Sequence, residues 1–292
     1  AGDPKILSIR HAFPKLYKFE KDHGSILQGA LFSRKNAADK LSKGTPRSIT
    51  FKNGMQTLTD ALRDELGDRI RVNTPVESLR KSVDFGFEIT TGSVTESFDA
   101  AIICTPASAA ARLIESLDNG LAGELNKIVY PPLAVVVTAF KQMDVAVDPD
   151  GFGFLVPGVE RRPILGCLWT SSVFENRAPD GYHLFTTFIG GARRAELVQN
   201  SDEELVKLAV DELKHNLGVK SDPVFVNVKK WDSAIPQYNL GYETVVDAIE
   251  TFTEQNRGIF FCSNFYRGIS VSDCVKNSIA TSADVRASLN RQ

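Results

Sequence analysis

The C-terminal part of the sequence contains the pattern that most constrains the fold: an apolar strand, a glycine-containing turn and a long helix. The strand is predicted over residues 258–262 and the helix over 271–289. Such a connection is typical of α/β folds. Because the first N–H groups of a helix have no acceptor within it, this helix start can stabilise an anion or a polarised carbonyl. Ser270, Ser272 and Asp273 also fit as plain N-caps, so an ordinary α/β connection is the alternative interpretation.

Helical and strand patterns alternate along the rest of the chain, and together they predict a mixed α+β fold. Leu58 and Leu62 recur at helical spacing, and Ser201 with Glu204 forms a capping box. Helices are predicted over residues 55–66, 105–117, 201–213 and 245–252, with further N-caps at Asp3-Pro4 and Ser25. Strands are predicted over residues 48–51, 70–73, 100–104, 133–141, 152–156, 164–170, 183–189 and 224–231.

Composition and charge argue against several classes of protein. The 292 residues carry a formal net charge of −2, which is not the basic signature of a nucleic-acid-binding protein. No apolar run reaches the roughly 18 residues that span a bilayer, and we expect no signal peptide. The four cysteines form no C-x-x-C pair, so we expect buried free thiols, no metal site and a reducing, cytoplasmic location.

The first 50 residues are basic, with ten Lys/Arg against four Asp/Glu. Apolar residues such as Leu16 and Phe19 are interleaved with these charges. A basic, apolar helical hairpin can lie on an anionic membrane, which would make the protein peripheral, or bind a carboxylated ligand. A solvated basic face on packed helices is an equally good interpretation.

Motifs along the chain point to a family, although four common catalytic or nucleotide-binding patterns are missing. The sequence lacks G-x-G-x-x-G, the P-loop, H-E-x-x-H and G-x-S-x-G, so it predicts no catalytic side chain. Its distinctive segments are Ala1–Ile26, Lys52–Leu58, Pro75-Val76, Cys104–Ala107, Gly151–Pro157, Ile235–Tyr238 and Gly268–Cys274. In this order they resemble the protoporphyrinogen oxidase family of the FAD-dependent amine-oxidase superfamily, and the resemblance spans the whole chain.

The resemblance implies a truncated flavin-oxidoreductase fold, in which part of an FAD-binding domain joins a substrate domain. In that family the G-x-G-x-x-G motif lies upstream, so we expect this chain to be a C-terminal portion. The implied division is the tail of a membrane-associated helical lobe (1–45), two FAD-domain segments (46–118 and 236–292) and a substrate domain (119–235). A missing N-terminal half or a second copy in a homodimer is the expected protein partner.

The resemblance also implies which residues contact FAD: Val76, Trp231, Ile269, Ser270 and Val271. The backbone of Val76 would hold the adenine end, and Trp231 would lie near the flavin. The backbone of residues 269–271 would line the flavin pyrimidine, where a helix start stabilises the negative charge of reduced flavin. The alternative is that Val76 and Trp231 are core residues.

Four residues are implied for the tetrapyrrole pocket: Phe152, Gly153, Leu155 and Phe188. Phe152 would stack on a pyrrole ring, and Gly153 would let the backbone approach closely. The alternative is that all four belong to the core of a sheet.

The function implied by the resemblance is oxidation of protoporphyrinogen IX or coproporphyrinogen III to the porphyrin in haem biosynthesis, with FAD as cofactor and oxygen as acceptor. Two alternatives stay open. The chain can belong to another flavoenzyme of the superfamily with a different apolar substrate, or it can be a non-catalytic module that binds a porphyrin or a partner. A bound porphyrin without any response to amines would exclude the first alternative, and flavin binding would exclude the second.

Overall fold

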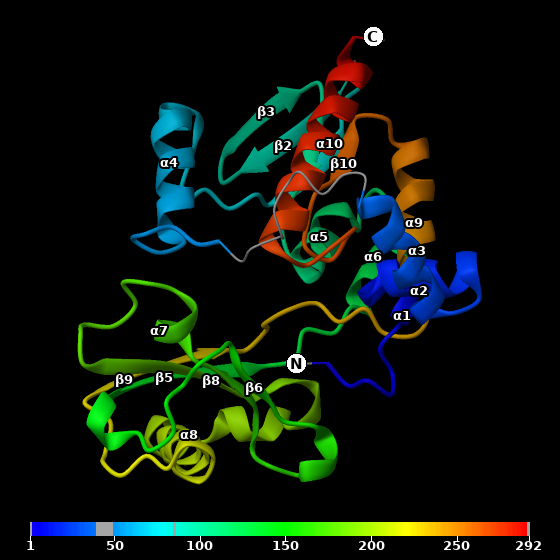
Figure 1. The fold of residues 1–292 in the computed structure, drawn as a ribbon. Coiled ribbons are helices and arrows are strands. Elements are labelled where there is room, and N and C mark those ends of the chain that lie inside the picture. The colour runs from blue at the N-terminus through cyan, green and yellow to red at the C-terminus, as the bar shows by residue number, and fades with distance from the viewer. Residues whose placement is uncertain (1, 39–48, 84–85, 291–292) are drawn as a thin grey trace. The chain divides into compact units, whose positions relative to one another are not determined.

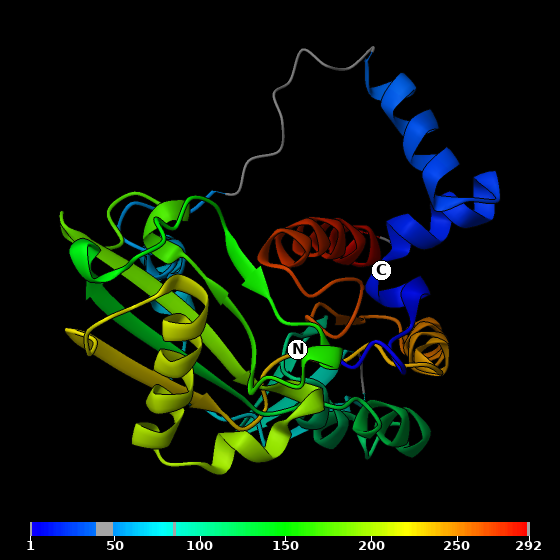
Figure 2. The ribbon, with the colours of Figure 1, turned by 60° about the horizontal axis from the view of Figure 1, so that its bottom comes forward.

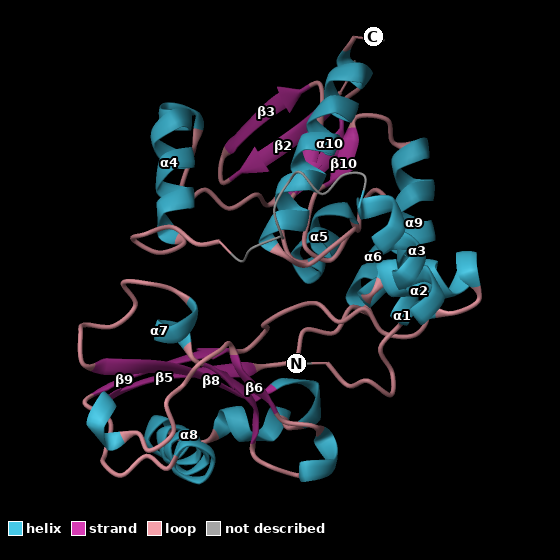
Figure 3. Cartoon of the chain, in the orientation of Figure 1, coloured by secondary structure: helices cyan, strands magenta, loops and turns pink. Residues whose placement is uncertain are grey.

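The chain forms two compact units, each of which contains helices and strands. The computed structural model describes residues 2–38, 49–83 and 86–290. Of these residues, unit 1 holds 2–3, 49–67 and 130–234, and unit 2 holds the remainder. Figure 3 shows the mixture of helices and strands, which confirms the predicted α+β class.

The core of unit 1 is a five-stranded antiparallel sheet with a helix against one face. The strand order is β6-β7-β8-β5-β9. The strands are β5 (Leu133–Lys141), β6 (Gly153–Leu155), β7 (Ile164–Leu168), β8 (Tyr182–Gly190) and β9 (Phe225–Trp231). Helix α8 (Asp202–Leu217) begins at the predicted capping box, in which Ser201 and Glu204 bond each other's backbone N–H groups. Figures 1 and 2 show α8 along one face of this sheet.

Strand β5 shows how the side chains divide between the two faces of the sheet. Ala134 and Val136 are fully buried and pack in a cluster with apolar residues of α8. Alternate residues of a strand point to opposite faces. Leu133, Val135 and Val137 therefore point away from α8, and we call that side the open face.

Shorter elements complete unit 1. They are α4 (Gln56–Leu66), α7 (Thr170–Val173) and the 3-10 turns η2 (Gln142–Asp144), η3 (Gly158–Glu160), η4 (Gly191–Arg193) and η5 (Ala195–Gln199). Thr186 of β8 is paired with Val137, so it points to the open face. Its hydroxyl is 2.7 Å from the hydroxyl of Thr170, the first residue of α7. Helix α7 therefore lies on the side of the open face.

Unit 2 contains the strand-turn-helix pattern. Strand β10 (Ile259–Phe261) pairs in parallel with β4 (Ala101–Ile103), and β1 (Ser78–Lys81), β2 (Phe87–Thr91) and β3 (Val94–Phe98) form an antiparallel sheet. The helices are α1 (Ile9–Ala12), α2 (Pro14–His23), α3 (Ile26–Ala38), α5 (Ala107–Ile114), α6 (Asn119–Asn126), α9 (Tyr242–Gln255) and α10 (Val271–Leu289). The short turn η1 (Gly67–Arg69) joins α4 to this unit.

Most predicted elements are confirmed, and two strands and one helix cap are wrong. Residues 49–51 and 70–73 form no strand, and residue 48 lies outside the described residues. Val72 is 72% exposed and Asn73 has a φ of 54°, so the β-branched side chains of this segment lie in a turn that has no partner strand. Asp3-Pro4 caps no helix, because the first helix begins at Ile9.

The four cysteines match the expectation of buried free thiols only in part. All four cysteines are free. Cys167 is buried, and burial raises the pKa of its thiol to about 11. The expectation of burial is wrong for Cys104, which follows the end of β4 and is exposed.

Within the described ranges, no helix is both long and apolar enough to cross a membrane, and no group of three or more His, Cys, Asp or Glu side chains could hold a metal ion.

Candidate functional site

The turn between β10 and α10 is held by specific hydrogen bonds. Ser270 is the N-cap of α10: its Oγ accepts the Asp273 N–H at 3.1 Å and donates to the Asp273 carboxylate at 2.6 Å. Gly268 has a φ of 135°, and a Cβ there would lie 2.6 Å from the Asp273 Cβ, so the turn requires glycine. The Gly268 N–H donates to the Tyr238 hydroxyl at 3.1 Å. The plain N-cap interpretation of Ser270 is confirmed, and its side chain is engaged within the turn.

A cavity of about 550 Å³ adjoins this turn, and we call it the turn cavity. Its lining includes Ile269 and Ser270 together with Arg10 and His11 of α1. His11 Nε2 is buried and has no hydrogen-bond partner among the described residues; the nearest carboxylate oxygen, on Glu243, is 4.0 Å away. Buried polar atoms are normally hydrogen-bonded. The described residues therefore leave one polar atom of a residue that lines the turn cavity without a hydrogen bond.

The charge state of His11 follows from its surroundings. Burial, with a further contribution from Arg10, holds the pKa of His11 below its usual 6.5, and the carboxylates of Glu243 and Asp247 oppose this only in part. The imidazole is therefore neutral at pH 7, so each of its nitrogens can act as a donor or an acceptor according to the tautomer.

The other predicted flavin residues occupy different places. Val76 lines a second cavity of unit 2, of about 790 Å³, beside Cys104 and Thr105 at the end of β4. Thr105 Oγ1 is buried there and, among the described residues, has no hydrogen-bond partner. Val271 is the first residue of α10 and is exposed. Trp231 belongs to unit 1.

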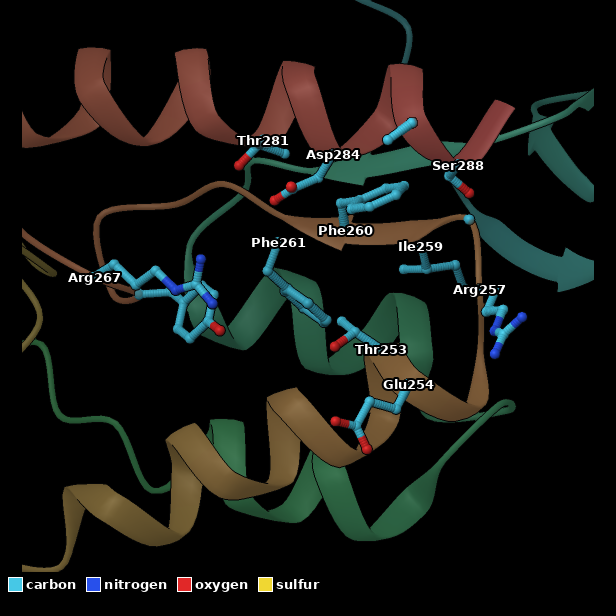
Figure 4. Close-up of a pocket in the computed structure, with 13 residues that line it drawn as sticks. Thr253, Glu254, Arg257, Ile259, Phe260, Phe261, Arg267, Thr281, Asp284 and Ser288 are labelled. Carbon is cyan, nitrogen blue, oxygen red and sulfur yellow. The ribbon is translucent and has the colours of Figure 1, made fainter. Parts of the chain in front are cut away.

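A third cavity of unit 2, of about 480 Å³, lies between α9, β10 and α10 (Figure 4). Its lining includes the charged residues Glu254, Arg257 and Asp284, and Figure 4 shows Asp284 near the ring of Phe260. None of the predicted site residues lines it. Arg267 borders both this cavity and the turn cavity.

Two of the predicted pocket contacts, Leu155 and Phe188, lie on the open face of the unit 1 sheet. Leu155 pairs with Gly166, Gly166 with Phe188, Phe188 with Val135, and Val135 with Lys229. Residues paired across neighbouring strands point to the same face. Leu155, Phe188 and Lys229 therefore lie in one row across this face, to which Leu155 contributes an 85% exposed side chain.

Trp231 lies on the same face as this row. It pairs with Leu133, which points away from α8, and its side chain is 50% exposed. The Lys229 ammonium lies 5.1 Å from the centre of the Trp231 ring, within cation–π range. Lys229 is not among the site residues predicted from the sequence. Its spacing of two residues from Trp231 on one strand was the available signal.

Gly153 and Phe152 have different roles from one another. Gly153 has a φ of 123°, and a Cβ at this position would lie 2.0 Å from the carbonyl oxygen of Cys167. The close approach that requires glycine is therefore that of strand β7. Phe152 precedes β6, its carbonyl accepts the Trp169 N–H at 3.0 Å, and its side chain is 64% exposed. The core interpretation is wrong for Phe152, as it is for Leu155 and Trp231.

Comparison with known proteins places these observations in a family. The family model described as "Flavin containing amine oxidoreductase" matches residues 1–286. The mitochondrial protoporphyrinogen oxidase of Nicotiana tabacum is 34% identical over 94% of this chain and 60% of its own length. The coproporphyrinogen III oxidase of Bacillus subtilis is 25% identical over 97% of this chain and 61% of its own. The chain thus spans about 60% of the length of these curated relatives.

A solved structure shows the same fold. A protein from Exiguobacterium sp. 255-15, provisionally named a protoporphyrinogen oxidase, superimposes with a TM-score of 0.76 at 23% identity. The match covers 98% of this chain and 61% of that one. The shared fold agrees with the family match, which covers nearly the whole sequence. The chain belongs to the flavin-containing amine oxidoreductase family.

Proposed function

We propose that the chain is part of a flavoenzyme that uses FAD to oxidise a porphyrinogen to the porphyrin, as in haem biosynthesis. The observation that carries this proposal is the 34% identity to a protein named protoporphyrinogen oxidase, over 94% of the chain. Because the relative named coproporphyrinogen III oxidase is only 25% identical, protoporphyrinogen IX is the preferred substrate and coproporphyrinogen III the second candidate.

The residues around the turn cavity fit the flavin ring. The cavity has an unsatisfied His11 nitrogen on one side and the start of α10 on the other. The backbone N–H groups of Val271 and Ser272 belong to the first turn of that helix, where no intrahelical acceptor exists. When bound, FAD would accept electrons from the porphyrinogen and pass them to oxygen. The helix start would favour the added negative charge, and neutral His11 would hydrogen-bond a ring atom.

The open face of the unit 1 sheet fits a flat macrocycle with carboxylate side chains. Leu155, Phe188 and Val135 provide an apolar floor, and Trp231 provides an aromatic surface beside it. Lys229 is the cation on this floor, placed to pair with a propionate. Desolvated apolar surface with a few placed polar groups is the usual composition of a small-molecule site.

A contact with a membrane surface is a further part of the proposal. Helices α2 and α3 carry exposed apolar side chains among basic residues: Leu16, Leu27, Leu31 and Phe32 are all exposed. This composition favours binding to an anionic bilayer. Sedimentation with vesicles of anionic lipid tests the contact, and Leu27→Asp/Leu31→Asp should weaken it.

The experiment that tests the function is a porphyrinogen turnover assay. The chain with added FAD is mixed with protoporphyrinogen IX or coproporphyrinogen III in air, and porphyrin fluorescence is followed. Lys229→Gln should raise KM several-fold. Lys230→Gln is the matched control, because Lys230 points to the α8 side, where it bonds Asp202 and the Asn200 carbonyl. Porphyrin formation no faster than in the protein-free mixture, by a folded chain that has bound FAD, would contradict the proposed function.

A further inference from the structure

Four arginines line one cavity of unit 1, apart from the open face and the turn cavity. Arg161 and Arg162 come from the segment after η3, and Arg193 and Arg194 come from the segment after β8. The cavity measures about 280 Å³, and none of its lining residues is acidic. Two segments about 30 residues apart in sequence thus bring four arginines to the lining of one small cavity.

Two of these arginines are neutralised by carboxylates outside the lining. Arg162 Nε lies 2.9 and 3.0 Å from the two carboxylate oxygens of Glu212, and its Nη2 lies 2.8 Å from one of them. Glu212 is a residue of α8 whose side chain is 5% exposed. Arg194 Nε donates to Glu196 at 2.8 Å at the surface. These contacts fix the two side chains but use only part of the donors that each guanidinium carries.

The other two arginines have no ion-pair partner among the described residues. Arg193 Nη2 donates to the Val156 carbonyl at 3.1 Å, and its Nη1 lies 3.1 Å from where a Cβ of Gly158 would be. The guanidinium therefore lies against the backbone of Gly158 in a fixed position. Arg161 is exposed and has a φ of 53°, a left-handed conformation that is uncommon for a residue with a side chain.

Among the described residues, no carboxylate pairs with Arg161 or Arg193, so two of the arginines that line this cavity keep an uncompensated positive charge. Neighbouring like charges repel one another, and an anion that pairs with both reduces that repulsion. Guanidinium groups match phosphate oxygens with paired N–H donors, and two uncompensated charges match a phosphate dianion. We propose that this cavity is a binding site for a phosphate group, carried by a free phosphate compound or by a lipid headgroup. Arg161 and Arg193 provide the charge, and Arg162 and Arg194 provide further donors.

The test is calorimetric titration of the full chain with inorganic phosphate. Saturable binding is expected, with a Kd raised at least tenfold in Arg161→Gln and in Arg193→Gln. Arg80→Gln is the matched control, because Arg80 is an exposed arginine on β1 that does not line this cavity. Arg161 makes no ion pair with any residue that the structure describes, so its variant should fold normally, which a thermal melt checks.

A vesicle experiment distinguishes the two sources of the phosphate group. Vesicles of phosphatidylcholine with and without phosphatidic acid are sedimented with the wild-type chain, Arg161→Gln and Arg80→Gln. Binding that needs phosphatidic acid and Arg161, without saturable binding of inorganic phosphate, assigns the site to a lipid headgroup. Binding of inorganic phosphate that needs Arg161 assigns it to a free compound. Failure of both ligands, or equal losses in Arg161→Gln and Arg80→Gln, overturns the proposal. Neither result bears on porphyrinogen turnover.

Discussion

Phe152 and Phe185 are the same residue type in one unit, but the structure predicts that alanine at the two positions has different consequences. Phe152 is 64% exposed, whereas Phe185 is fully buried and packs against Phe140 at a ring distance of 6.1 Å. With roughly 200 Å² of side-chain area, the covered third of Phe152 is roughly 70 Å², worth about 2 kcal/mol at most. Loss of a fully buried phenylalanine costs about 3–5 kcal/mol. Phe152→Ala should therefore destabilise unit 1 clearly less than Phe185→Ala.

Ligand binding should show the opposite order. If Phe152 stacks on the tetrapyrrole, its removal loses about 0.5–1.5 kcal/mol of ring contact in addition to apolar area, so Kd should rise about tenfold. Urea unfolding gives the two stabilities, and quenching of intrinsic fluorescence by protoporphyrin IX gives the affinities. Suppose instead that Phe152→Ala unfolds as readily as Phe185→Ala while its folded fraction binds porphyrin normally. Phe152 would then be a structural residue, and the pocket assignment would fail.

Three further predictions concern stability and pH. Arg162→Met leaves the buried Glu212 carboxylate without its partner and should lower the free energy of unfolding by about 3 kcal/mol in urea titrations. The double variant Arg162→Met/Glu212→Leu should recover most of this lost stability. A double variant no more stable than Arg162→Met would refute this explanation. Gly153→Ala puts a Cβ 2.0 Å from a carbonyl oxygen of β7 and should cost at least about 1–3 kcal/mol, so an unchanged Tm contradicts the geometry. Burial lowers the pKa of His11 and His183 below 6.5, so the unfolded chain binds more protons, and stability should fall as the pH drops from about 7.5 through 6.5. His11→Gln/His183→Gln should flatten that slope in melts across this range, and an unchanged slope would assign the loss to other groups.

The sequence predicts the fold well where local chemistry and tertiary contacts agree. Residues 133–141 and 271–289 coincide with β5 and α10, because a β-branched run and an N-capped helical segment also have partners to pack against. Residues 70–73 have the same strand propensity and no partner strand, so they form a turn and an exposed segment instead. β-propensity alone carries no information about whether a second strand is available.

The candidate sites depend on contacts that a sequence does not contain. Leu155 and Phe188 were selected through a family resemblance, but their common row became visible only with the strand register. Lys229 joins that row through β5. His11 is unremarkable in sequence, and its unsatisfied nitrogen results from the packing of α1 beside the turn. The two arginine pairs likewise meet only through folding of the sheet.

Flavin binding by the purified chain is the measurement that tests the central claim most directly. FAD is titrated into the chain while the visible absorbance and the flavin fluorescence are recorded. We predict saturable quenching with a resolved, shifted flavin band, and a loss of both in Gly268→Val, which disrupts the turn before α10. A chain that melts cooperatively yet leaves the flavin spectrum unchanged at every concentration would contradict the claim that the turn cavity holds the cofactor.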